Sequence, residues 1–203
     1  MNRRAMIKAR FLTPFALIAL SLAGCRSELA APPARPPLEG AAIGGPFTLV
    51  DKSGKAVGWS DFAGSYRIVY FGYTFCPDAC PLDVGVMMRG FTAFEKARPE
   101  LGAKVRPLFI TIDPERDTPA VVGEFAAAFS PKLTGLTGTP AQVAVAAKAF
   151  AVYYKRGGNT AGGYLMDHSR VAFLMDQHGK PLAMLPVDLG AEAVAAELAK
   201  WVQ

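Results

Sequence analysis

Residues 66–81 of this 203-residue chain read YRIVYFGYTFCPDACP. The first half of the stretch is largely β-branched and aromatic and shows no alternation of polar and apolar positions, which is typical of a strand buried on both faces of a sheet. Pro81 fits the first turn of a helix that continues to about Arg98. The stretch therefore predicts a central strand over Tyr66–Tyr73, a turn that carries two cysteines, and a helix.

The elements on either side predict an α/β domain. The expected elements are a hairpin of Phe47–Val50 with Ala56–Trp59, a buried strand over Val105–Ile112, helices over Pro119–Phe129 and Pro140–Phe150, a hairpin of Val171–Met175 with Pro181–Leu185, and a terminal helix over Ala191–Val202. The two middle helices each begin with Pro after Thr, which are favoured at the first helical position and at the N-cap. This order predicts a mixed central sheet with helices on both faces and an N-terminal β-hairpin.

Cys76 and Cys80 lie between the carboxyl end of the central strand and the next helix, where open α/β sheets place their ligands. Two thiols four positions apart can meet one ion, and a helix N-terminus favours the thiolate, which both attacks disulfides and binds metals. A structural disulfide is the alternative, although closing so small a loop contributes only about 2 kcal/mol. The spacing is neither that of the thioredoxin motif nor that of haem attachment.

The chain has two histidines, and their positions differ. His168 precedes a predicted strand, from where it can reach the cysteine turn, whereas His178 lies in a turn that we expect to be exposed. Two thiolates and one imidazole suit Cu(I), or Cu(II) with a further ligand. From the residues alone, a zinc site with an open position and a purely structural His168 are the alternatives.

Three motifs resemble the Sco/SenC family of copper chaperones. They are YFGYTFCPDACP at 70–81, TIDPERDTP at 111–119 and DHS at 167–169. They stand in the family's order and spacing, and the resemblance covers about residues 43–202. It implies a thioredoxin-like fold in which Cys76, Cys80 and His168 bind one copper ion. It also implies delivery of that copper to the binuclear copper site of cytochrome c oxidase subunit II, after loading from a periplasmic copper donor.

Further residues are candidates for supporting roles. Asp78 and Asp113 match acidic positions of the family motifs, where they would support the ligands or dock the partner. Met166 is the methionine best placed to approach the ion, since it stands two residues before His168. The segment Lys155–Gly158 is expected to form a solvated loop beside that histidine.

The N-terminal region has the pattern of a lipoprotein signal. Residues 1–24 hold four basic residues and no acid, with an apolar run of about 12 residues that is shorter than the roughly 20 needed to span a bilayer. We expect a signal peptide over 1–24, acylation of Cys25, a tether rich in Ala and Pro over 25–42, and the copper-binding domain over 43–203. The protein would then lie outside the cytoplasm, anchored by its lipid. The signal pattern leaves the inner and the outer membrane open, and we expect the periplasmic face of the inner membrane because the oxidase client that the resemblance implies lies there.

Net charge gives no support for a nucleic-acid partner. The chain has a formal charge of +5 from 22 basic and 17 acidic residues, but the four basic residues of 1–24 leave 18 against 17 in the remainder.

Three functions are compatible with a thioredoxin-like fold, because fold alone does not determine function. Copper delivery is the leading hypothesis. The second is a thiol-disulfide oxidoreductase that uses Cys76 and Cys80 to reduce the cysteines of the client's copper site, and the third is a peroxidase-like enzyme. Of the three, copper delivery alone uses His168, which makes this residue the discriminator.

Overall fold

The structure, a computed structural model, describes residues 35–161 and 163–203. The predicted signal peptide, Cys25 and the first part of the predicted tether lie outside these residues. At the end of the predicted tether, Leu38 packs against the core and donates its N–H to the carbonyl of Leu182 at 3.0 Å, so this part of the chain lies on the domain. Within the described part of the chain, no helix is long and apolar enough to cross a bilayer.

The centre of the domain is a five-stranded mixed sheet. Its strands, in spatial order, are β5 (Thr134–Leu136), β4 (Val105–Thr111), β3 (Tyr66–Gly72), β8 (Ala172–Met175) and β9 (Pro181–Leu185). Strands β3, β4 and β5 are parallel, whereas β8 and β9 run antiparallel to their neighbours. All seven residues of β3 are buried, as the unbroken apolar pattern predicts for a strand covered on both faces.

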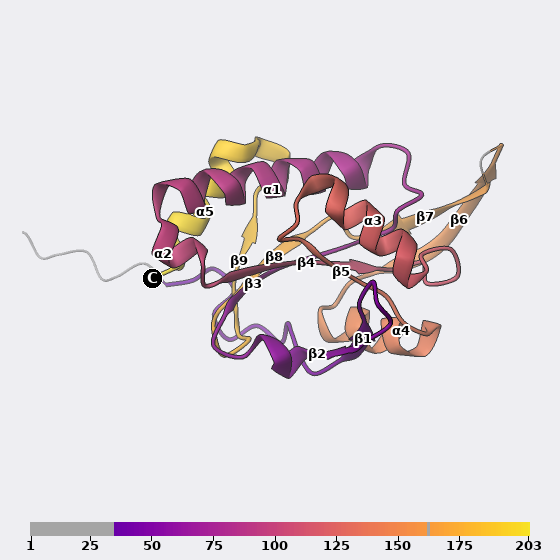
Figure 1. Cartoon of the computed structure of the whole chain (residues 1–203), viewed down its shortest axis with the longest axis horizontal. Helices are drawn as coiled ribbons and strands as arrows, with labels where there is room; N and C mark the ends of the chain where they lie inside the picture. The colour runs from indigo at the N-terminus through magenta and orange to yellow at the C-terminus, as the bar shows by residue number, and fades with distance from the viewer. Residues whose placement is uncertain (1–34, 162) are drawn as a thin grey trace, which may run out of the picture. The chain divides into compact units, whose positions relative to one another are not determined.

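Helices cover both faces of the sheet (Figure 1). One face carries α1 (Ala79–Ala97), α2 (Pro99–Gly102), α3 (Pro119–Phe129) and α5 (Ala191–Trp201), and the other carries α4 (Pro140–Ala149) with the hairpin of β1 (Thr48–Val50) and β2 (Ala56–Gly58). Short 3₁₀ helices, η1 (Trp59–Phe62) and η2 (Val187–Leu189), complete the connections. Thr118 and Thr139 accept backbone hydrogen bonds at the starts of α3 and α4, which confirms the predicted caps.

One segment differs from expectation. Residues 155–158, predicted as a solvated loop, belong to β6 (Tyr154–Thr160), which pairs with β7 (Gly163–His168) in a separate two-stranded sheet. The loop prediction was wrong because Gly157 and Gly158 have little strand preference of their own, and pairing with β7 supplies the missing stabilisation. The two glycines coincide with the shift in register between Arg156 and Asn159, a place where extended strands tolerate glycine. Figure 1 shows this hairpin reaching beyond the edge of the domain.

Candidate metal centre

The two thiols lie in the connection between β3 and α1. Cys76 is half-buried in the turn, and Cys80 is fully buried in the first turn of α1. Both are free thiols, and the backbone N–H of Cys80 points at the Sγ of Cys76 at 3.3 Å. The turn after β3 therefore brings the two cysteines together without joining them covalently.

Gly72, the last residue of β3, leaves the space that the Cys80 thiol occupies. A Cβ at this position would lie 3.1 Å from the Sγ of Cys80 and 2.9 Å from Cε1 of Tyr70. Carbon atoms of a side chain rarely approach that closely, so a larger residue would push the thiol away from the strand.

The two thiols have opposite proton affinities. The hydrogen bond from the Cys80 side chain, helped by His168 and opposed by burial, lowers the pKa of Cys76 from 9.0 to about 3. The same hydrogen bond, with burial in addition, raises the pKa of Cys80 above its ordinary value. At neutral pH the pair therefore holds a thiolate at Cys76 and a protonated thiol at Cys80.

His168 is the last residue of β7 and faces the cysteines. Its Nδ1 lies 2.9 Å from the carbonyl oxygen of Ser169, and since a carbonyl only accepts, Nδ1 carries a proton; in the neutral imidazole, Nε2 is then the nitrogen with the lone pair. Nε2 lies 3.3 Å from the Sγ of Cys80. The rings of Tyr70 and Tyr73 meet the imidazole edge-on at 6.4 and 6.0 Å between centroids, which fixes its orientation.

This arrangement brings three soft or intermediate ligand atoms together, with the Cys80 Sγ beside both the Cys76 thiolate and the His168 Nε2. Among the residues with described coordinates, no three His, Cys, Asp or Glu side chains already form a metal cage. To bind an ion, the two thiol side chains would have to rotate and exchange their present hydrogen bonds for bonds to the metal. Chemically, the cluster offers two sulfurs and one imidazole nitrogen, a set that suits copper, and also a dithiol ready for disulfide exchange.

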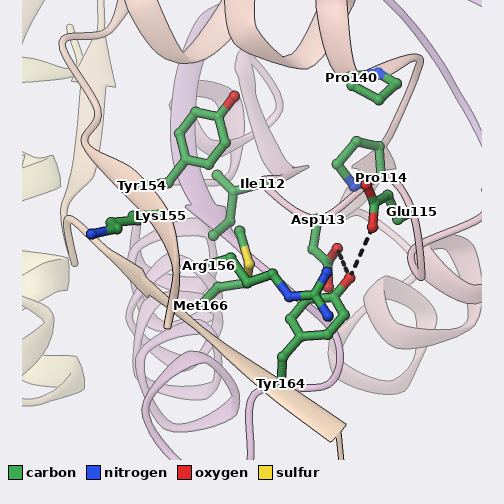
Figure 2. A pocket seen from close by; sticks show the side chains of 10 residues that line it. All are labelled: Ile112, Asp113, Pro114, Glu115, Pro140, Tyr154, Lys155, Arg156, Tyr164 and Met166. Atoms are coloured by element: carbon green, nitrogen blue, oxygen red, sulfur yellow. Dashed lines mark hydrogen bonds between the residues drawn. The ribbon is translucent and has the colours of Figure 1, made fainter. Parts of the chain in front are cut away.

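Among the described hydrogen bonds, the side chains of the predicted supporting residues Asp78, Asp113 and Met166 make none with the thiols. Asp78 is exposed at the start of α1, and only its backbone N–H helps to lower the pKa of Cys76. Asp113 is buried beneath the β6–β7 hairpin, where it pairs with Arg116 at 2.5 Å and accepts the Tyr164 hydroxyl at 2.8 Å. Met166 lines a cavity of about 230 Å³ with Tyr164 and its neighbours (Figure 2). In Figure 2, dashed lines join the Tyr164 hydroxyl to two carboxylates at this cavity.

Asp117 was not singled out from the sequence, although it lies within the 111–119 motif. This buried carboxylate accepts hydrogen bonds from the backbone N–H of Thr74 at 3.0 Å, from the Thr74 hydroxyl at 2.5 Å and from the Thr111 hydroxyl at 2.6 Å. Burial raises its pKa. Asp117 therefore ties the cysteine turn to the end of β4.

Asp83 and Arg170 were also missed. Asp83 is 3% exposed on the buried face of α1, where it accepts hydrogen bonds from the Tyr70 hydroxyl at 2.9 Å and from two nitrogens of Arg170 at 2.7 and 3.0 Å. The sequence holds one signal for this site: a charged residue stands at a helical position that shares its face with Cys80 and Met87.

The match to a protein family extends over the whole described part of the chain. The SCO1/SenC family profile matches residues 35–203. The chain is 43% identical over 135 residues to mitochondrial protein SCO1 homolog 1 of Arabidopsis thaliana, and 44% identical over 136 residues to protein SenC of Rhodobacter capsulatus. These matches cover 66% and 67% of this chain but 40% and 60% of the relatives' own lengths.

Solved structures agree with this match. ScoI of Bradyrhizobium japonicum with copper bound is 38% identical, has a TM-score of 0.70, and aligns over 78% of this chain and 99% of its own. The thioredoxin domain of a thiol-disulfide oxidoreductase from Bacteroides vulgatus, at 17% identity and a TM-score of 0.54 over 79% of this chain and 96% of its own, shares the fold alone, which is thioredoxin-like. On the extent of the profile match and of these identities, the chain belongs to the SCO1/SenC family.

Proposed function

We propose that this protein is a copper metallochaperone that binds one copper ion as cargo through Cys76, Cys80 and His168. The observation that carries the proposal is the approach of the His168 Nε2 to the Cys80 Sγ at 3.3 Å, with a tautomer that leaves Nε2 free to bind. Membership of a family with copper-bound structures supports the choice of metal.

The proton states of the cluster suit reversible loading. Cys76 is already a thiolate, so of the two thiols only Cys80 has to lose a proton to the solvent when the ion binds, and the neutral imidazole of His168 offers the lone pair of Nε2. A site that gives up one proton on loading regains it on release.

The client that we propose is the binuclear copper site of cytochrome c oxidase subunit II, with a periplasmic copper donor upstream. The proposal for these partners rests on the family and on the three motifs that this chain shares with it. We further propose that the chain acts outside the cytoplasm and is held at the inner membrane through a lipid on Cys25. Residues 22–25, Leu-Ala-Gly-Cys, support this part of the proposal.

A second candidate function is favoured by the unequal thiols. In a thiol-disulfide exchange, the Cys76 thiolate would attack a client disulfide and release one client thiol, leaving a mixed disulfide. The sulfur of Cys80 would then attack Cys76 and release the second client thiol, so that two electrons pass to the client and a Cys76–Cys80 disulfide remains. Such a reaction needs a thiolate beside a protonated partner, which this pair provides.

Substitution of His168 separates the two functions. We expect His168→Ala to lower copper affinity by more than about 100-fold, since loss of a ligand should exceed the roughly 10–100-fold cost of losing a group that supports one. The variant should also lose the sulfur-to-copper charge-transfer absorption of the Cu(II) form. Its cysteine pair should still oxidise and reduce reversibly, because the imidazole contributes no atom to disulfide exchange.

His178→Ala is the matched control, because this second histidine is exposed in the turn between β8 and β9. It should bind copper as the wild type does. In cells, His168→Ala should fail to support oxidase assembly. If it supports assembly at equal expression while Cys76→Ala fails, copper delivery is the wrong function and the reductase takes its place.

A further inference from the structure

The Asp83–Arg170 pair joins the two chain segments that carry the proposed ligands. Asp83 stands three residues after Cys80 on α1, and Arg170 stands two residues after His168, between β7 and β8. Cys80 and His168 are 88 residues apart in the chain. Their separation is therefore set by tertiary contacts such as this one, not by the intervening backbone.

The geometry of the pair is restrictive. Nε and Nη2 of Arg170 approach Oδ2 and Oδ1 of Asp83 at 3.0 and 2.7 Å, so each carboxylate oxygen receives one guanidinium nitrogen. Such two-pronged contacts fix orientation as well as distance. The carboxylate is 4% exposed, whereas the arginine side chain is 53% exposed, so the acid is held within the protein and the base reaches it from the surface.

A third group links this pair to the imidazole. The Tyr70 hydroxyl donates to Oδ2 of Asp83 at 2.9 Å, and the Tyr70 ring lies edge-on to His168. The Asp83 carboxylate of α1 thus accepts hydrogen bonds from Tyr70 of β3 and from Arg170 in the connection between β7 and β8. The proposed ligands Cys80 and His168 lie on α1 and at the end of β7, so the pair links the segments that carry them.

We propose that Asp83 and Arg170 are positioning residues that hold His168 at bonding distance from the thiols. The inference rests on the proposed copper site, since it concerns the distance between that site's ligands. The described hydrogen bonds of the Arg170 side chain go to Asp83 and not to a thiol or the imidazole, so its effect on copper is expected to pass through the placement of His168.

Arg170→Met is the decisive variant, because it keeps the length of the side chain at a half-exposed position and removes the guanidinium. In the purified, reduced full chain, Cu(I) affinity measured against a competing chelator should fall about 10-fold or more, the usual effect of removing a group that supports a metal ligand. Arg170→Lys, which keeps the charge but loses one of the two hydrogen bonds to Asp83, should keep more affinity than Arg170→Met but less than the wild type. Arg89→Met, the same change at an exposed position of α1, should leave the affinity unchanged.

A double-mutant cycle distinguishes positioning from a general loss of stability. If Arg170 acts through His168, adding Arg170→Met to His168→Ala should cause no further loss of Cu(I) affinity. A metal-free measurement gives the same test: NMR cross-peaks between the His168 and Tyr70 rings should weaken in Arg170→Met and persist in Arg89→Met.

The outcomes separate this inference from the proposed function. If Arg170→Met binds Cu(I) as tightly as the wild type, or its effect adds fully to that of His168→Ala, the positioning role is wrong while the copper site stands. If the wild type itself binds no Cu(I), or His168→Ala binds normally, the copper site is wrong. Should Arg170→Met fail to fold, the Arg170→Lys variant carries the same cycle.

Discussion

Cys76 and Cys80 are chemically unequal although they stand four residues apart. Cys76 accepts hydrogen bonds and lies partly in solvent, whereas Cys80 donates one and is fully buried. A single shared proton is the largest cause of both effects, because the hydrogen bond that stabilises the Cys76 thiolate also holds the proton on Cys80, and burial of Cys80 adds to the difference. Solvent reagents therefore meet the more reactive sulfur first.

This asymmetry predicts selective alkylation of the reduced, metal-free protein. Because the pKa of Cys76 is lowered to about 3, Cys76 stays a thiolate as the pH falls from 9 to about 5 and should still react with iodoacetamide there. Cys80 should remain unmodified over the whole range. Peptide mapping by mass spectrometry distinguishes the sites, and the same reaction in denaturant, where both thiols titrate normally, is the control. Equal labelling of both cysteines at pH 5 would contradict the assignment.

At the scale of single elements, the close packing at Gly72, the end of β3, fixes the position of the Cys80 thiol. Gly72→Ala would bring a methyl group to 3.1 Å from the Cys80 Sγ and to 3.1 Å from Cε2 of Phe109. We expect a loss of about 1–3 kcal/mol in the free energy of unfolding, as for other overpacked cores, together with weaker copper binding because the thiol moves. Denaturant unfolding and chelator competition measure the two effects.

Gly158→Ala is the matched control for this substitution. A Cβ at Gly158 would have nothing within 4 Å, and the residue lies in β6 away from the thiols. Its effect on stability should stay within about 0.5 kcal/mol, as for ordinary surface changes. A Gly72→Ala variant that is as stable as Gly158→Ala would show that the end of β3 can accommodate a methyl group without overpacking.

The sequence predicts an element well when local pattern and tertiary environment agree. Strand β3 is apolar without interruption and is buried throughout, and α3 and α4 begin after the threonines that cap them. Strand β6 escaped prediction because its exposed, glycine-containing residues are held by pairing with β7 rather than by burial.

The same division applies to the candidate site. The cysteines are neighbours in the chain, so their proximity follows from the sequence, whereas the approach of His168 was expected from its place before a strand and from the family motifs. The Asp83–Arg170 contact joins residues 87 positions apart, and no local pattern specifies which buried acid meets which arginine. Long-range polar pairs of this kind become visible only when the whole fold is assembled.

For the whole molecule, the proposed attachment to the membrane would depend on Cys25, which lies outside the described part of the chain. We expect Cys25→Ser to release the protein from the membrane fraction or to leave its signal uncleaved, because the site of acylation is lost. Cys76→Ser, which keeps Cys25, should remain in the membrane fraction. Mass spectrometry of the mature N-terminus decides the matter, and an unmodified N-terminus downstream of residue 25 would contradict the lipid anchor.

The span of 88 residues between Cys80 and His168 has a consequence for biogenesis. If the chain is exported from its N-terminus, as we propose, its thiols emerge long before the imidazole, so an incomplete chain can offer copper only sulfur. The full affinity of the proposed site arises only after the last strands have joined the sheet, and a ligand that binds only the native state stabilises it in return. Copper supply and the lifetime of this protein against cellular proteases would then rise and fall together.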